Sequence, residues 1–111
     1  MGLQFSKNGD VLVALPDGRL DTSNAPEAEK AIDDQIDEGN HRIVIDFSKT
    51  SYISSAGLRV ILKTAKLITQ KGGGFALCNA NEQIGEVLQI SGFNSLVKCL
   101  ETLDEAIEAV S

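Results

Sequence analysis

The sequence predicts an α/β protein built around one mixed β-sheet whose strands are mostly parallel. Short apolar runs alternate with segments of ten or more residues that have helical periodicity, and such alternation implies parallel strands joined by helical crossovers. A turn signal after the first apolar run predicts that the chain opens with an antiparallel hairpin. The expected order of elements is therefore ββαβαβαβα, with about four helices.

The hairpin is expected to comprise Leu3–Ser6 and Val11–Leu15, two apolar runs separated by Lys7-Asn8-Gly9-Asp10. Pro16-Asp17-Gly18 follows at once. Because proline and glycine favour turns, this tripeptide is expected to end the second strand or to turn it.

A first helix is expected to begin after Thr22-Ser23-Asn24. Asn24 and Glu27 have the spacing of a capping pair, and Pro26 is tolerated in a first helical turn. Gly39-Asn40 should end the helix. Its apolar stripe consists of Ala28, Ala31, Ile32 and Ile36.

The β-branched run Ile43–Phe47 indicates a buried central strand. The next helix is expected over Ser55–Gln70, ended by Gly72-Gly73-Gly74. Its apolar positions, spaced three or four residues apart, are Leu58, Ile61, Leu62, Ala65 and Ile68. The remaining expected elements are a strand over Phe75–Cys78, a helix over Asn81–Ile90, a strand over Leu96–Leu100 and a helix over Leu103–Val110.

Composition excludes several classes of function. The 111 residues fit one domain spanning 1–111, and the net charge of −6 without a basic patch disfavours nucleic acid as a partner. Since no run approaches the roughly 20 apolar residues of a membrane span and no signal peptide is evident, we expect a cytoplasmic protein without membrane insertion. The acidic surface suggests a monomer when free. Cys78 and Cys99 lie in apolar runs, so both are expected to be buried thiols, and with a single histidine no metal or other cofactor is expected.

The most informative segment is the junction Tyr52–Arg59, between a strand and a helix N-terminus. Backbone N–H groups there have no helical partner, so a serine hydroxyl can cap the helix. The same donors would also stabilise a phosphate added to that hydroxyl. Ala56 and Gly57 are small, so a partner protein could approach the serines closely.

Five segments in order resemble the STAS domain, and specifically the stand-alone anti-sigma factor antagonists related to sporulation stage II protein AA. The resemblance covers nearly the whole chain. The segments are Gly18-Arg19-Leu20-Asp21, Ile43–Ser48, Ile53–Leu58, Lys71-Gly72-Gly73 and Ile90-Ser91-Gly92-Phe93.

This resemblance implies a non-catalytic protein that regulates transcription by partner switching. In the family, the unphosphorylated antagonist binds an anti-sigma factor that is also a serine/threonine kinase, phosphorylation prevents that binding, and a metal-dependent serine phosphatase reverses it. The match places the phosphorylated residue at Ser55, with Ser54 as the alternative because it replaces the usual aspartate. The partner-binding residues that the resemblance implies are Asp21, Thr22, Ser54, Ser55, Ala56, Gly57, Leu58 and Arg59.

Other functions fit the sequence less well. A hydrolase elbow would need glycine where Ile53 stands, and Asp46 lacks the acidic pair and lysine that accompany a response-regulator acceptor. The alternative that remains is a STAS subunit of a lipid-transport or signalling complex that is never phosphorylated, because one fold can serve several functions.

Overall fold

The computed structural model describes residues 2–93 and 97–111 of the chain. The described residues contain the predicted elements in the predicted order and one further short strand, β4. The strands are β1 (Gly2–Asn8), β2 (Val11–Leu20), β3 (Arg42–Asp46), β4 (Thr50–Ile53), β5 (Gly74–Cys78) and β6 (Lys98–Leu100). The helices are α1 (Ala25–Asp37), α2 (Ser55–Gln70), α3 (Glu82–Ile90) and α4 (Leu103–Val110).

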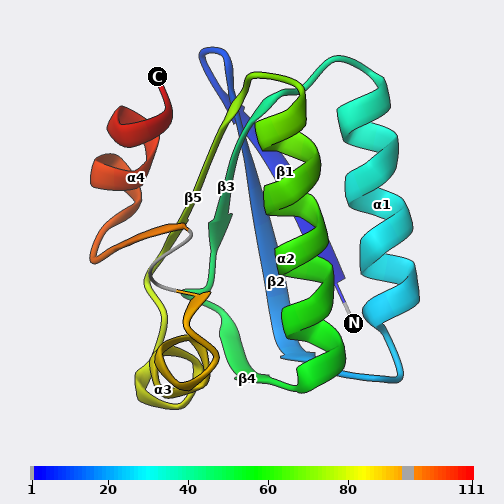
Figure 1. Cartoon of the computed structure of the whole chain (residues 1–111), viewed down its shortest axis with the longest axis vertical. Helices are drawn as coiled ribbons and strands as arrows, with labels where there is room; N and C mark the ends of the chain where they lie inside the picture. Colours follow the sequence, from blue (N-terminus) through cyan, green and yellow to red (C-terminus); the bar gives the residue numbers. More distant parts are fainter. Residues whose placement is uncertain (1, 94–96) are drawn as a thin grey trace.

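The strands form one mixed sheet in the order β1-β2-β3-β5-β6, with β4 paired to β2 beyond the end of β3 (Figure 1). Only the β1–β2 hairpin is antiparallel, and all other recorded pairs are parallel. The predicted fold class is therefore confirmed.

Helices cover both faces of this sheet. Helices α1, α2 and α3 pack on one face, where the main core includes Ile32, Ile61 and Ile84. Helix α4 covers the opposite face, where Ala106 and Val110 pack on Val44 of β3. The two layers are visible on either side of the strands in Figure 1. Among the described helices, none is long and apolar enough to span a membrane.

The predicted end of the second strand at Pro16-Asp17-Gly18 is wrong, because β2 continues to Leu20. Pro16 lies where β2 leaves its pairing with β3, at Ala14, and before it begins to pair with β4, at Gly18. No ladder partner on that side is recorded for Pro16, so its missing N–H is tolerated. Gly18 has a φ of 88° next to a register shift, which makes it a bulge rather than a strand end.

Two local predictions also need correction. Asn24 is the N-cap of α1 as expected, but it forms no capping bond with the helix; its amide instead accepts from the Asp21 N–H at 2.9 Å and donates to the Arg19 carbonyl at 2.7 Å. Cys99 is exposed because it lies on the short edge strand β6, whereas Cys78 is buried as predicted. The start of the predicted strand at Leu96 lies outside the described residues.

Candidate functional site

The candidate site lies where β2 and β4 end and α2 begins. Parallel strands carry binding sites at their carboxyl ends, and here two of them end side by side, with Leu20 paired to Ile53. The Ser54 N–H continues the ladder by donating to the Leu20 carbonyl at 3.0 Å. The backbone that carries both candidate serines is therefore fixed by the sheet.

The two serines have different roles in the structure. Ser54 is the N-cap of α2, and its hydroxyl accepts from the Gly57 N–H at 3.2 Å. Ser55 is the first helical residue and is exposed, and its hydroxyl makes no recorded hydrogen bond to any described residue. Aspartate, the usual family residue at Ser54, is also a good N-cap, so the substitution preserves this local structure.

Gly57 is buried beneath the site and is not a surface residue. A Cβ at this position would lie 2.6 Å from the Leu20 carbonyl oxygen, 2.9 Å from Leu20 Cγ and 3.0 Å from Ile53 Cγ1. Only glycine lets the first turn of α2 sit this close to β2. Gly57 thus supports the serines from below.

Helix α3 holds β4 in place through side-chain amides. The Gln83 amide accepts from the Ile53 N–H at 3.2 Å and donates to the Ile53 carbonyl at 3.4 Å. The Asn81 amide donates to the Thr50 and Ser51 carbonyls at 3.2 and 3.1 Å. On the side of β4 away from β2, these two amide side chains form the hydrogen bonds that a neighbouring strand would otherwise provide. We call Asn81 and Gln83 together the amide clamp.

Beside the serines, a polar cluster closes the end of β2. The Arg19 guanidinium lies over the Tyr52 ring, 4.2 Å from its centroid, and its Nε is 3.3 Å from an Asp21 carboxylate oxygen. The Ser23 hydroxyl donates to Asp21 at 2.6 Å and the Ser23 N–H at 3.0 Å. The Ser23 hydroxyl, followed by its N–H and by Arg19, lowers the pKa of the Asp21 carboxyl.

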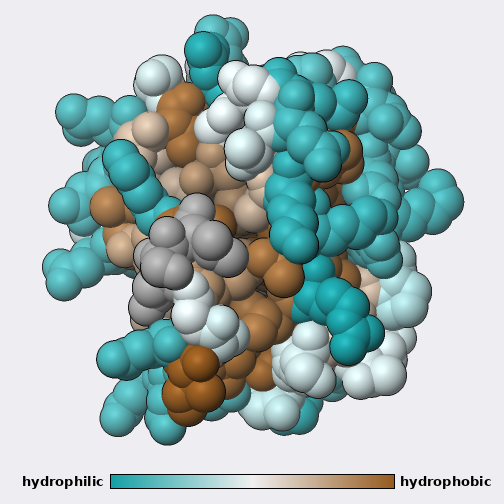
Figure 2. Space-filling model, viewed as in Figure 1, coloured by the Kyte–Doolittle hydropathy of each residue, from teal (hydrophilic) through white to brown (hydrophobic). Residues whose placement is uncertain are grey.

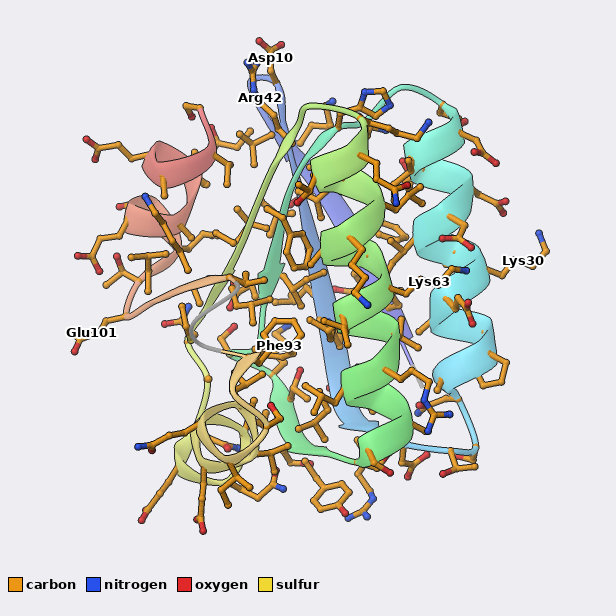
Figure 3. The ribbon with its side chains drawn as sticks, viewed as in Figure 1. Asp10, Lys30, Arg42, Lys63, Phe93 and Glu101 are labelled. Atoms are coloured by element: carbon orange, nitrogen blue, oxygen red, sulfur yellow. The ribbon has the colours of Figure 1, made fainter. Side chains whose placement is uncertain are left out.

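An apolar groove of about 240 Å³ opens next to Ser55, between α2 and the segment that follows α3. Its lining residues are Ser55, Leu58, Arg59, Leu62, Ser91 and Phe93. Phe93 lies between α2 and α3 in Figure 3, and hydrophobic surface is visible around α2 in Figure 2. Ile90, at the end of α3, is 79% exposed.

The implied partner-binding residues fall into three groups. Ser55, Leu58 and Arg59 line the groove, while Thr22, Ala56 and again Arg59 line a second hollow between α1 and α2. Asp21 and Ser54 are held in hydrogen bonds, and Gly57 is buried.

Sequence reasoning missed Gln83 and the groove wall at Phe93. In the sequence, Phe93 stands out only as the last residue of a segment that resembles the family. Leu58 and Leu62 were predicted to belong to the core stripe of α2, but they are only partly buried and face the groove. Asp46 has a structural role. Its carboxylate accepts hydrogen bonds from the Ser48 N–H at 2.9 Å and from the Asn79 side-chain amide at 3.0 Å, and so anchors the loop that follows β3.

Comparisons with known proteins agree with this geometry. BtrV of Bordetella bronchiseptica, named as a candidate anti-sigma factor antagonist, is 37% identical over 98% of this chain and 94% of its own length. The crystal structure of a candidate anti-sigma factor antagonist from Thermotoga maritima is 31% identical, with a TM-score of 0.94 over 97% of this chain and 93% of that one.

A more distant structure shares the fold. The Bacillus cell fate determinant SpoIIAA, in its phosphorylated form, superposes with a TM-score of 0.76 at 23% identity and covers 96% of this chain and 97% of its own. The STAS domain model matches residues 3–106, which is most of the chain. Because this model matches most of the chain, the chain belongs to the STAS domain family.

Proposed function

We propose that this chain is an anti-sigma factor antagonist that regulates transcription by partner switching, and that phosphorylation of Ser55 prevents its binding to an anti-sigma factor with serine/threonine kinase activity. The observation that carries the proposal is the difference between the hydrogen bonding and exposure of Ser54 and those of Ser55. Ser54 is committed to capping α2, whereas the Ser55 hydroxyl is exposed beside the apolar groove. The names of the relatives support the same regulatory class.

The location of Ser55 explains how one modification would abolish a complex. The groove beside it presents Leu58 and Leu62, partly exposed side chains suited to burial against another protein, and the already buried Phe93 forms part of its lining. A phosphate adds about −1.5 to −2 charge. A partner that covered the groove would have to desolvate this charge at the rim, which costs far more than burial of a hydroxyl.

The catalytic steps of the switch would belong to the partners. The sequence lacks the glycine-rich loop with lysine and metal ligands that phosphoryl transfer uses. The proposal accordingly assigns phosphorylation to the anti-sigma factor kinase and dephosphorylation to a metal-dependent serine phosphatase. It also places the protein in the cytoplasm, with the sigma factor that it controls.

Mass spectrometry of the protein isolated from its native cells tests the proposal, combined with pull-down of partners by Ser55→Ala, Ser55→Asp and the control Ser54→Ala. We expect phosphate on Ser55, retention of a kinase partner by Ser55→Ala, and loss of that partner with Ser55→Asp. Ser54→Ala should retain the partner, because Ser54 acts in capping.

Absence of phosphate under every growth condition, together with the same partners for all variants, would overturn the proposal. That result would instead indicate a constitutive subunit of a lipid-transport or signalling complex. Phosphate found on Ser54 alone would reject the assignment of the site while keeping the switch.

A further inference from the structure

Arg59 lies one helical turn after Ser55 and is the only one of the three arginines for which the described residues provide no ion pair. Arg19 pairs with Asp21, and Arg42 lies 4.0 Å from Asp10. Arg59 lines the groove together with Ser55. The structure therefore places an uncompensated guanidinium beside the exposed hydroxyl.

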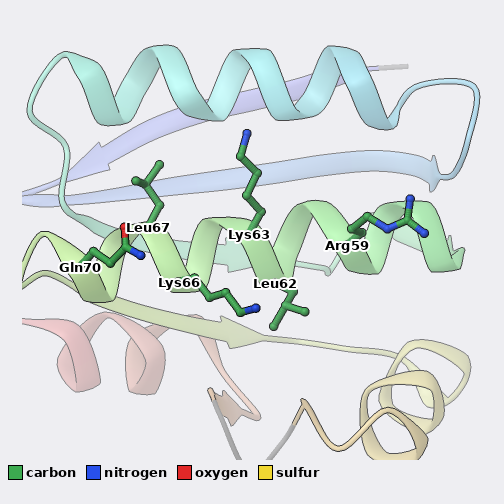
Figure 4. Close-up of a pocket in the computed structure, with 6 residues that line it drawn as sticks. All are labelled: Arg59, Leu62, Lys63, Lys66, Leu67 and Gln70. Carbon is green, nitrogen blue, oxygen red and sulfur yellow. The ribbon is translucent and has the colours of Figure 1, made fainter.

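No carboxylate of residues 2–93 and 97–111 pairs with this guanidinium. The acidic group that shares the α1–α2 hollow with Arg59 is Glu29, and Glu29 binds Lys63, which Asp33 also contacts at 3.0 Å. The first turn of α2 contains no acidic residue. Figure 4 shows the Arg59 side chain extending along α2 toward the N-terminal end of the helix, which begins at Ser55.

Helix geometry brings a group on Ser55 within reach of Arg59. Side chains four residues apart lie on one face, with Cβ atoms about 5–6 Å apart, and helical side chains lean toward the N-terminus. An acidic group that precedes its basic partner by four residues is the favoured orientation. Ser54 is five residues from Arg59, and its hydroxyl already caps α2 at the Gly57 N–H, so the spacing selects Ser55.

We propose that Arg59 is the internal receptor for the phosphoryl group on Ser55, binding the phosphate oxygens through its guanidinium across one turn of α2. This inference rests on the proposed phosphorylation at Ser55 and deepens it. Such charge-assisted, bidentate pairs are stronger than neutral hydrogen bonds. Phosphorylation then changes the groove rim twice: it adds a dianion, and it engages the Arg59 guanidinium, which is then no longer available to a partner.

The test is a ³¹P NMR titration of full-length chain in which phosphoserine is incorporated at position 55 during translation. Wild type is compared with Arg59→Gln and with the control Lys66→Gln. Lys66 is also an exposed cation on α2, but along the helix axis it lies about 16 Å from Ser55, beyond the Debye length of about 8 Å at physiological salt.

A bound guanidinium favours the dianion, so the second pKa of the phosphate should lie below its ordinary value of about 6 in wild type. We expect Arg59→Gln to raise that pKa by roughly 0.5 and Lys66→Gln to leave it within about 0.1 of wild type. Raising the salt concentration should narrow the difference between wild type and Arg59→Gln, because the pair is exposed to solvent.

Equal pKa values for Arg59→Gln and Lys66→Gln would overturn the inference. This result is independent of the proposed function, because the phosphoserine is installed without any kinase. If Arg59→Gln raises the phosphate pKa but the phosphorylated chain still binds its partner, the inferred pair between Arg59 and the phosphate is supported and the proposed partner switching is rejected.

Discussion

Replacement of Gly57 by alanine tests the close packing beneath the site. The new Cβ would lie 2.6 Å from the Leu20 carbonyl oxygen, about 0.8 Å short of ordinary contact, which begins at 3.4 Å. That oxygen belongs to backbone and also accepts from the Ser54 N–H, so the first turn of α2 would have to move away from it.

Three terms set the size of the effect. Overpacking costs about 1–3 kcal/mol, and weakening the Ser54–Leu20 hydrogen bond costs about 1 kcal/mol more. Alanine recovers about 1 kcal/mol through its higher helix propensity. We expect Gly57→Ala to lower the free energy of unfolding by about 1–3 kcal/mol, which corresponds to roughly 4 °C in Tm per kcal/mol for a chain of this size.

Gly85 in α3 provides the matched control, because a Cβ there meets no atom within 4 Å. Gly85→Ala should therefore raise the free energy of unfolding by about 0.5–1 kcal/mol. Urea denaturation followed by circular dichroism measures both changes. A Gly57→Ala chain as stable as wild type would refute the packing argument, since the contact with Leu20 would then cost no more than the helix propensity of alanine recovers.

Three further outcomes follow from contacts of the described residues. Gln83→Leu leaves the Ile53 N–H without its acceptor, so urea denaturation should show that the free energy of unfolding falls by about 1–3 kcal/mol. An unchanged free energy of unfolding would contradict this and would mean that water replaces the amide. Burial raises the pKa of Cys78 to about 12, so at pH 8 a thiol reagent should label only Cys99 in native protein and both cysteines after unfolding. Because the folded pKa of Cys78 exceeds its unfolded value of 9.0, that thiol's contribution to stability is complete below pH 9 and is lost as pH rises toward 12; a Cys78→Ala chain should not show this loss. Lys63→Met should leave the urea midpoint of unfolding at the wild-type value despite its two carboxylate partners on α1, because the pairs are half-exposed; a clear drop in that midpoint would contradict this.

Patterns within single elements predicted the framework well. Helix α2 runs over Ser55–Gln70 as expected, because its apolar spacing and the glycines after it determine both period and end. The parallel part of the sheet followed from the alternation of elements, and the hairpin from the turn signal after the first apolar run. Ser55 as the phosphorylated residue stays a prediction, which rests on its position between a strand and a helix N-terminus and on the resemblance to a family.

Features that depend on contacts between distant segments could not be predicted in this way. Strand β4 has only four residues, and its pairing with β2 needs the bulge at Gly18, which sequence alone presents as a turn. The Asn24 side chain bonds the loop before α1 rather than the helix, a choice set by the positions of Arg19 and Asp21. Gln83 carries no periodic signal, because its role depends on where α3 packs.

The amide clamp makes one backbone amide a reporter on a helix that it does not belong to. The Ile53 N–H is bonded to Gln83 of α3, 30 residues later, rather than to another strand. Its hydrogen exchange therefore requires α3 to separate from β4, even while the rest of the sheet stays closed. Protection at this single amide would measure the free energy with which α3 docks beside the proposed phosphorylation site. Comparing that protection with and without phosphate on Ser55 would show whether the modification reaches α3 or remains confined to the first turn of α2.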